Sequence, residues 1–178
     1  MFLSGDLSDV CIVSDRLTLR SFVPADAADC FVEANERIAR YMSWNPPASA
    51  EEYRGIWQGL LADMKAGRQM SLTARRTDTG EFIGSVGLHP AEGDLLETGL
   101  WVKESAHRKG YGREAVAAVI AWASRRFRPG GFLYPVVDEN APSCRLVESL
   151  GGTVTGRRQR QKPGDTMSTL LLYRVAPT

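Results

Sequence analysis

Two closely spaced glycines, Gly110 and Gly112, separate a predicted strand over residues 95–102 from a predicted helix over residues 111–127. Glycines at a helix N-terminus leave backbone N–H groups uncovered, and the helix dipole adds partial positive charge there. The arrangement is typical of a turn that holds a pyrophosphate. On glycine spacing alone, a turn that only lets the helix start against a sheet is an equally good interpretation.

Cationic side chains surround this turn, at Arg108, Lys109 and Arg113. A Walker A loop does not fit, because it needs Gly-Lys-Ser/Thr and here Gly112 is followed by Arg113 and Glu114. A dinucleotide fingerprint does not fit either, because it needs three glycines after the first strand of a βαβ unit.

The order of predicted elements indicates an α+β domain with a mixed, mostly antiparallel sheet flanked by about four helices. The helix between Val102 and Phe132 is a crossover that makes these two strands parallel. Residues 1–12 are expected to form a loose or strapped-down N-terminal extension, and residues 13–178 a single domain. The predicted strands span residues 13–22, 69–76, 81–89, 95–102, 132–137, 153–158 and 168–175, and the helices 26–40, 49–66, 111–127 and 141–150.

Composition excludes several classes of protein. The 178 residues carry a net charge of +1, so direct DNA binding is not expected. No apolar run is long enough to cross a bilayer and the N-terminus lacks signal-peptide features, so a cytoplasmic location away from membranes is expected. Three distant cysteines and two histidines offer no zinc spacing, so no metal is expected.

The glycine turn resembles the acyl-CoA-binding signature of the Gcn5-related N-acetyltransferases (GNAT), which is Gln/Arg-x-x-Gly-x-Gly/Ala. It reads His107-Arg108-Lys109-Gly110-Tyr111-Gly112, with His107 in place of Gln or Arg. Further matches run in family order from residue 13 to 175, and several resemble the Rim-type branch, whose namesakes acetylate ribosomal-protein N-termini. They are the segments 15–20, 41–51, 97–102, 140–143 and 148–151.

The resemblance implies a sheet that splays into a V between its two parallel strands, with acetyl-CoA as acyl donor. Pro135 would then lie on a splayed strand, or would simply mark that strand as short. Asn140 would meet the cofactor, cap the helix beside it, or do both. The other implied cofactor-binding residues are Leu100, Trp101 and Val102 for the pantetheine arm, and His107, Arg108, Lys109, Gly110, Tyr111, Gly112 and Arg113 for the pyrophosphate. Arg108 and Lys109 have solvated surface charge as the alternative.

Two side chains are candidates for catalysis. Glu97, on the strand before the turn, is the expected base that deprotonates the amine through water, or else an exposed carboxylate paired with an arginine. Many relatives carry a tyrosine proton donor where this chain has Val147. Ser143 is therefore the expected donor to the leaving thiolate, unless it serves only as a helix-cap hydroxyl.

The expected activity is transfer of an acetyl group to a primary amine, either a small molecule or a protein N-terminus, by a monomer or homodimer. A non-catalytic CoA-binding module and a transferase for a bulkier acyl group such as succinyl are the alternatives. Substrate selection is expected in residues 42–53 and in the loop 157–165, whose basic tip is otherwise a solvated surface.

Overall fold

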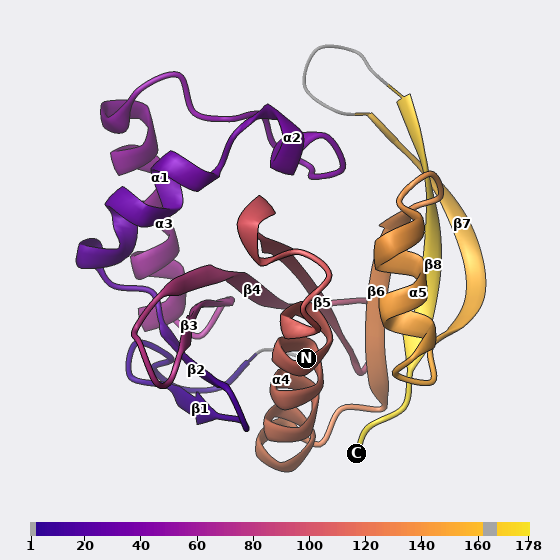
Figure 1. The fold of residues 1–178 in the computed structure, drawn as a ribbon. Helices are drawn as coiled ribbons and strands as arrows, with labels where there is room; N and C mark the ends of the chain where they lie inside the picture. The colour runs from indigo at the N-terminus through magenta and orange to yellow at the C-terminus, as the bar shows by residue number, and fades with distance from the viewer. Residues whose placement is uncertain (1–2, 162–166) are drawn as a thin grey trace.

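The computed structural model describes residues 3–161 and 167–178, which form one sheet of eight strands in the order β1-β2-β3-β4-β5-β6-β8-β7 (Figure 1). The strands are β1 (Cys11–Val13), β2 (Leu17–Ser21), β3 (Met70–Arg76), β4 (Phe82–Pro90), β5 (Leu95–Val102), β6 (Gly131–Val137), β7 (Thr153–Gln161) and β8 (Met167–Val175). The helices are η1 (Pro24–Asp26), α1 (Ala27–Glu33), α2 (Glu36–Ala39), α3 (Ala50–Lys65), η2 (Glu104–Ala106), α4 (Tyr111–Phe127) and α5 (Ala141–Glu148).

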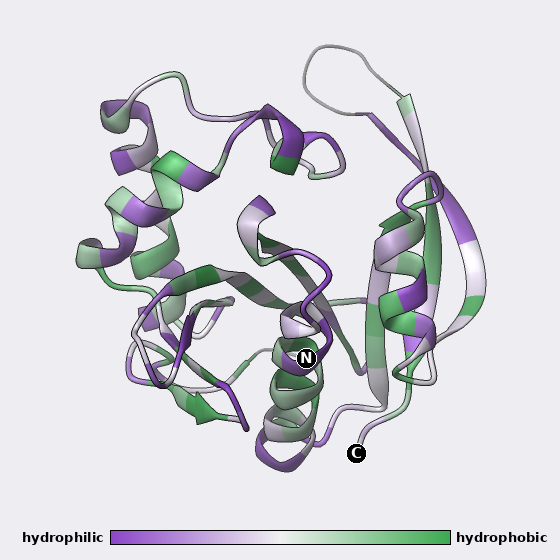
Figure 2. Cartoon of the chain, in the orientation of Figure 1, coloured by the Kyte–Doolittle hydropathy of each residue, from purple (hydrophilic) through white to green (hydrophobic). Residues whose placement is uncertain are grey.

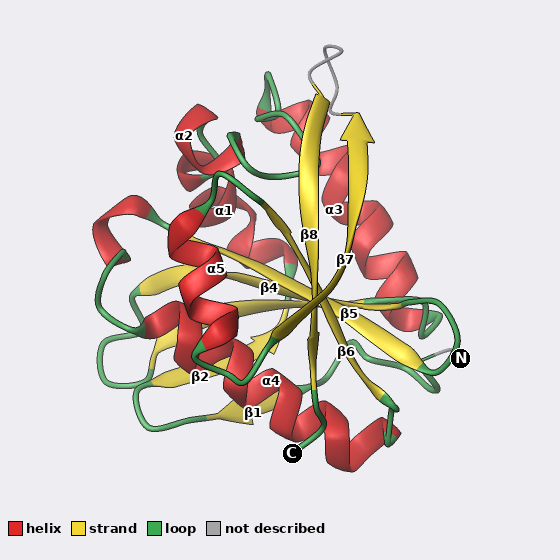
Figure 3. Cartoon of the chain, turned by 90° about the vertical axis from the view of Figure 1, so that its right-hand side faces the viewer, coloured by secondary structure: helices red, strands yellow, loops and turns green. Residues whose placement is uncertain are grey.

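The sheet is antiparallel except between β5 and β6, which α4 connects as a crossover. This confirms the predicted α+β class and the predicted parallel pair. Helices α4 and α5 lie on one side of the sheet and α3 lies on the other (Figure 3). The domain is therefore a two-sided layer structure in which both faces of the central strands are covered.

The core fills the space between these helices and the central strands. The largest fully buried side chains are those of Leu3, Leu7, Leu17, Leu19, Met64, Met70, Leu72, Ile83, Leu88, Leu96, Phe132 and Leu170.

Among residues 3–161 and 167–178, no helix combines the length and the apolar character that a membrane span requires.

The N-terminal segment is strapped down, which is one of the two states expected for it. Leu3 and Leu7 are each 2% exposed, and the Leu7 N–H donates to the Met64 carbonyl at 3.0 Å. Strand β1 then pairs with β2 from Cys11 onward. Burial of two leucine side chains stabilises this segment against the body of the domain by about 1.5–3 kcal/mol each.

The helix predicted over residues 26–40 is wrong as a single element. The chain instead forms η1 and α1, breaks at Ala34, and restarts as α2. Asn35 causes the restart, because its side-chain oxygen accepts hydrogen bonds from the N–H groups of Arg37 and Ile38 at 3.0 and 3.1 Å. An asparagine in this position satisfies the free N–H groups of a new helix.

Helix α3 begins as its capping signal predicts. The Ser49 hydroxyl accepts a hydrogen bond from the Glu52 N–H at 3.1 Å, and the Glu52 carboxylate accepts one from the Ala48 N–H at 2.6 Å. The helix ends just before Gly67, which has a φ of +67°. A left-handed glycine at this place is the usual way to end a helix.

Strand β7 is longer than predicted, because residues 157–161, expected to be a basic loop, continue the ladder with β8. The remaining residues of that predicted loop, 162–165, lie outside the described residues. In Figure 2 the C-terminal part of β7 is hydrophilic, whereas β8 beside it carries a hydrophobic stretch. Strand β7 is the edge of the sheet, where charged side chains are tolerated because they reach solvent.

Candidate active site

Strands β5 and β6 separate after three paired residues. Their parallel register runs only from Leu95↔Gly131 to Glu97↔Leu133, whereas β6 stays paired with β8 as far as Val137. The V-shaped splay predicted from the resemblance is therefore present. Pro135 lies on β6 beyond the last parallel pair, in an unbroken register with β8. Its missing N–H thus leaves the sheet intact.

A cavity of about 260 Å³ lies at the splay, with walls from β4, β5, β6, α5, β7 and the segment after α2. Five of the predicted site residues converge on it, which are Glu97, Leu100, Trp101, Asn140 and Ser143. Its other lining residues are Tyr41, Met42, Ser43, Trp44, Ser85, Gly87, His89, Gly99, Tyr134, Pro135, Val136, Val137 and Arg160.

Glu97 is half-buried in this cavity, directly opposite His89 in the β4–β5 register. Burial lowers the pKa of His89, and the Glu97 charge partly opposes that effect. The imidazole is therefore neutral at neutral pH. Among the described residues, no ion pair involves Glu97, so its carboxylate is available to a ligand.

A pair of glycines makes room beside Glu97. Gly87 on β4 is paired with Gly99 on β5, two residues along each strand from the His89↔Glu97 pair. Because side chains alternate along a strand, both pairs lie on the same face of the sheet. A Cβ added at Gly99 would meet no atom within 4 Å, whereas one at Gly87 would come within 2.9 Å of the His89 Nε2 atom. The floor of the cavity is thus open above Gly99, whereas the His89 ring lies over Gly87.

Hydroxyl groups meet on the opposite wall. Tyr134 on β6 is 2% exposed, and its hydroxyl oxygen lies 3.3 Å from that of Ser143 on α5. Burial raises the pKa of Tyr134 to about 12, although the hydrogen bond with Ser143 opposes that shift. Asn140 caps α5, as predicted, by accepting a hydrogen bond from the Ser143 N–H at 3.3 Å.

The glycine turn forms the N-terminus of α4, as the sequence predicts. Gly110 has a φ of +81° and Arg108 a φ of +59°. In the described part of the chain, the N–H groups of residues 108–113 have no backbone or side-chain acceptor. A run of free N–H groups at a helix N-terminus is a site for an anion.

The side chains around the turn divide between solvent and protein. Arg108 and Lys109 are exposed, and Arg113 donates to the Ser149 hydroxyl at 3.1 Å. His107 donates from Nε2 to the Val102 carbonyl at 2.7 Å, which closes the end of β5 onto the turn. Leu100 and Val102 face Gly112, where an added Cβ would lie 3.2 Å and 3.5 Å from their side-chain carbons.

Arg16 and Glu114 connect the glycine turn to the N-terminal part of the chain. The Glu114 carboxylate accepts hydrogen bonds from the Ser14 hydroxyl and from the N–H and Nε of Arg16, each at 2.7 Å. Burial acts to raise the pKa of Glu114, but these bonds outweigh it and hold the pKa below its usual value. Arg16 also donates to the Lys109 carbonyl at 3.0 Å, so the start of the chain fixes the turn.

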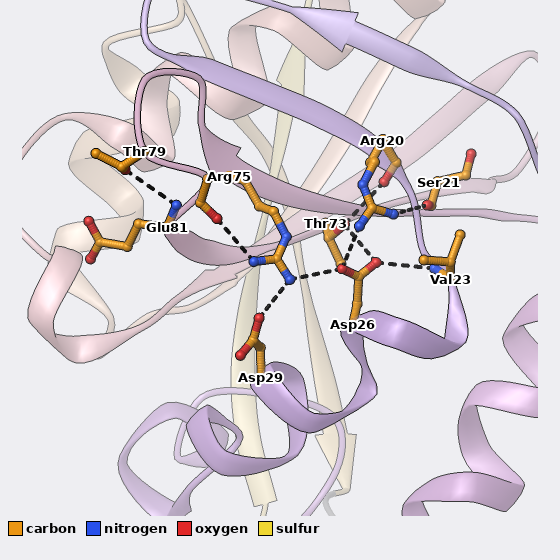
Figure 4. A network of polar contacts seen from close by, with 10 residues as sticks. Arg20, Ser21, Val23, Asp26, Asp29, Thr73, Arg75, Thr79 and Glu81 are labelled. Atoms are coloured by element: carbon orange, nitrogen blue, oxygen red, sulfur yellow. Dashed lines mark hydrogen bonds and ion pairs between the residues drawn. The ribbon is translucent and has the colours of Figure 1, made fainter.

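A buried carboxylate that the sequence did not single out ties α1 to the sheet (Figure 4). Asp26 is fully buried and lies 2.7 Å from the Arg20 guanidinium and 2.9 Å from that of Arg75. The Thr73 hydroxyl and the Val23 N–H complete its hydrogen bonds at 3.2 and 3.1 Å. All of its partners lie within the network, so Asp26 has a structural role.

Sequence reasoning missed Tyr134, which lines the cavity. Its ring is buried, but its hydroxyl reaches Ser143. Arg160 belongs to the predicted loop 157–165, for which substrate selection or a solvated surface was expected. It lies on strand β7 instead, and its side chain reaches the carbonyls of Tyr41 and Met42. A strand predicted to continue through residue 160 would have indicated the position of Arg160, because side chains alternate between the two faces of a strand.

The chain has known relatives. The sequence model of the acetyltransferase (GNAT) domain matches residues 16–153. An uncharacterized N-acetyltransferase of Bacillus subtilis (strain 168), YoaA, is 26% identical over 141 residues, which cover 78% of this chain and 80% of YoaA.

Two solved structures show the same fold. A ribosomal-protein-S5-alanine acetyltransferase from Vibrio fischeri superposes with a TM-score of 0.78 at 18% identity, covering 95% of this chain and 97% of that one. A spermidine N-acetyltransferase from Vibrio cholerae, in complex with CoA and spermine, superposes with a TM-score of 0.80 at 15% identity, covering 92% and 97%. With the domain match spanning most of the sequence, the splayed β5–β6 pair and the glycine turn at α4 identify this chain as an N-acetyltransferase of the GNAT family.

Proposed function

We propose that this protein transfers an acetyl group from acetyl-CoA to a primary amine by direct attack in a ternary complex. The observation that carries the proposal is the opening between β5 and β6 next to the free N–H groups of residues 108–113. The turn fits a pyrophosphate, and the unpaired edge of β5 fits an extended arm that hydrogen-bonds to backbone. Holding amine and thioester together in this way supplies much of the rate.

The cofactor contacts are assigned along one path. The residues 107–113 bind the pyrophosphate, chiefly through backbone N–H groups, with Arg108 and Lys109 adding charge from solvent. Leu100, Trp101 and Val102 offer main-chain groups to the pantetheine arm. An N–H near Trp101 or Val102 stabilises the negative charge that develops on the thioester oxygen. Asn140 contacts the arm from the opposite wall while it caps α5.

Glu97 acts as the base in this proposal. It takes a proton from the substrate ammonium, through water, so that the neutral amine attacks the acetyl carbonyl carbon. The half-buried position of the carboxylate and the open space above Gly99 support the assignment. Because His89 is neutral, it leaves the negative charge of Glu97 to attract the ammonium.

Ser143 supplies the proton to the sulfur when the C–S bond breaks. Its hydroxyl lines the cavity, and the Tyr134 hydroxyl beside it is a protonated reserve, because its pKa is raised to about 12. The first proton that leaves the ammonium passes to Glu97 and then to solvent. The second proton leaves the nitrogen when the tetrahedral intermediate collapses, and it restores the Ser143 hydroxyl. The products are therefore the amide, the free thiol and one released proton.

The acceptor is a small-molecule amine or a protein N-terminus. Fold relatives act on both kinds, one on ribosomal protein S5 and another on spermidine, according to their names. The test is to measure thiol release from acetyl-CoA with a panel of amines and peptides, for the wild type and for Glu97→Gln. Loss of turnover with retained CoA binding in the variant is expected. CoA binding without turnover of any amine by the wild type would favour the non-catalytic module instead.

A further inference from the structure

Arg160 is a cation that reaches into the cavity from the edge of the sheet. It lies on β7 opposite Ser168 of β8, and its side chain lines the same cavity as Glu97. Its Nη2 atom donates to the Tyr41 carbonyl at 3.1 Å and to the Met42 carbonyl at 3.2 Å. These bonds fix the guanidinium across the segment that follows α2.

Within the residues that the structure describes, only the Nη2 atom of Arg160 donates hydrogen bonds. Its Nε atom is buried and has no hydrogen-bond partner, and no ion pair joins the guanidinium to a carboxylate within residues 3–161 and 167–178. Buried donors without partners are rare in folded proteins, because an unmade hydrogen bond leaves the cost of desolvation uncompensated. An arginine that faces a cavity in this state is prepared for an anion.

The electrostatic surroundings of Arg160 agree with this. Burial and the nearby charge of Arg158 both lower the pKa of Arg160, in that order, so its positive charge is disfavoured where it stands. An arginine nevertheless stays protonated. Both effects would be relieved by a negative group bound at the guanidinium.

The cavity carries opposite charges on separate walls. Of its lining residues, Glu97 on β5 and Arg160 on β7 are the charged pair, with His89 neutral. Within the described residues no hydrogen bond or ion pair joins Glu97 to Arg160, so each keeps its charge for a ligand. A ligand with an ammonium at one end and an anion at the other matches this arrangement.

We propose that Arg160 binds a carboxylate of the substrate, so that this enzyme selects a carboxylate-bearing substrate over a neutral or polycationic one. The inference rests on the proposed acyl transfer in the same cavity. Arginine suits the planar carboxylate because its donors form a fork. The carboxylate has two sources, namely an amino-acid-like acceptor or the far end of a dicarboxylic acyl group such as succinyl.

Matched compounds separate these sources. For the acceptor, kcat/KM with acetyl-CoA is compared between free amino acids and the same amino acids as amides. For the donor, calorimetric binding is compared between succinyl-CoA and butyryl-CoA, a step that needs no turnover. A preference for the carboxylate in one of the two arms is expected, and it identifies the source. Equal values in both arms for the wild type would overturn the proposal, whether or not any variant folds.

Variants then assign the preference to Arg160. Arg160→Met is expected to lower the carboxylate preference about 10- to 100-fold, and Arg160→Lys by less. Arg157→Met is the matched control, since it removes an exposed arginine of the same strand whose side chain lies on the opposite face from Arg160, and it should leave the preference unchanged. A preference that Arg160→Met leaves intact would overturn the assignment.

Arg160→Met could also act by loosening the segment at Tyr41 and Met42. That effect would lower the binding of both compounds in each matched pair and leave the ratio of their affinities unchanged, which distinguishes it from loss of a carboxylate contact.

Failure of acyl transfer itself is also distinguishable. If no amine releases thiol, the CoA-saturated protein is titrated with N-acetyl-amino acids and with their amides, using the fluorescence of Trp44 and Trp101 in the cavity wall. Arg160-dependent preference for the acids there would support the proposal without turnover, and equal affinities would overturn it.

Discussion

The hydroxyl groups of Tyr134 and Ser143 lie 3.3 Å apart on the wall of the cavity that faces Glu97's strand. Neither residue is near the other in a sequence pattern, since one lies on β6 and the other on α5. Their contact gives the proposed proton donor a partner that keeps its own proton at neutral pH, because burial raises the Tyr134 pKa to about 12. Two neighbouring hydroxyls therefore lie on this wall of the cavity.

Removal of the Ser143 hydroxyl should slow the chemical step. We expect Ser143→Ala to lower kcat about 100-fold, the scale of one general acid, and Tyr134→Phe to lower it less, because Tyr134 acts through Ser143. Steady-state thiol release measures both. Tyr173→Phe is the control, since its hydroxyl donates to Glu148 at 2.8 Å and the residue does not line the cavity. An unchanged kcat in Ser143→Ala would contradict the assignment.

Replacement of Glu97 by Gln should remove the base while keeping the shape of the side chain. We expect kcat/KM for the amine to fall about 100-fold with the affinity for CoA unchanged, because the carboxylate acts on the amine. Kinetics and calorimetry on the same preparation measure the two quantities. Glu92→Gln, an exposed position in the turn before β5, should have full activity. Equal activity of both variants would exclude Glu97 as the base.

Substitution of Gly110 should lower the affinity for CoA as well as the stability of the fold. Gly110→Ala places a side chain at a φ of +81°, which costs about 1–2 kcal/mol. We expect it to weaken CoA binding, measured by calorimetry, because the strain moves the N–H groups of the turn. Gly93→Ala carries similar strain at a φ of +68° in a different turn, so it should lower stability alone. Equal CoA affinities in the two variants would count against a pyrophosphate site here.

Asp26 should be the most sensitive charged residue for stability. Asp26→Asn leaves the Arg20 and Arg75 guanidinium groups without their buried partner, and we expect a loss of about 3–5 kcal/mol in the free energy of unfolding. Urea titration measures it. Asp29→Asn removes a more exposed partner of Arg75, and it should cost about 1 kcal/mol or less. A larger loss from Asp29→Asn than from Asp26→Asn would contradict the network as described.

His89 should make stability depend on pH. Burial lowers its pKa in the folded protein, so below the unfolded value of about 6.5 the unfolded chain binds the additional proton. Stability is therefore retained above about pH 6.5 and falls as pH decreases toward the folded pKa. We expect His89→Gln to reduce this slope in urea titrations between pH 5 and 8. A slope in His89→Gln equal to that of the wild type would contradict the assignment to His89.

Local signals in the sequence were sufficient for most elements. The cap at Ser49 and the glycine turn before Tyr111 mark helix starts that the structure confirms, because both depend on neighbouring residues alone. The break at Asn35 has an equally local cause, but an asparagine inside a helical pattern is ambiguous until its side chain is seen to cap. Strand β7 extended through residues 157–161 because β8 provided the partner, which no local pattern could show.

The sequence by itself therefore determined the order of helices and strands from α3 onward, the crossover between β5 and β6, the glycine turn and the family. It did not separate β1 from β2, or α1 from α2. Tertiary structure alone decided which distant side chains share the cavity. Arg160 meets the carbonyls of Tyr41 and Met42, which lie more than a hundred residues earlier in the chain. Tyr134 meets Ser143 because α5 packs back against β6, the strand that precedes it. The physical reason is that helix caps and turns are satisfied within a few residues, whereas a cavity depends on contacts between segments that meet only after the sheet has formed.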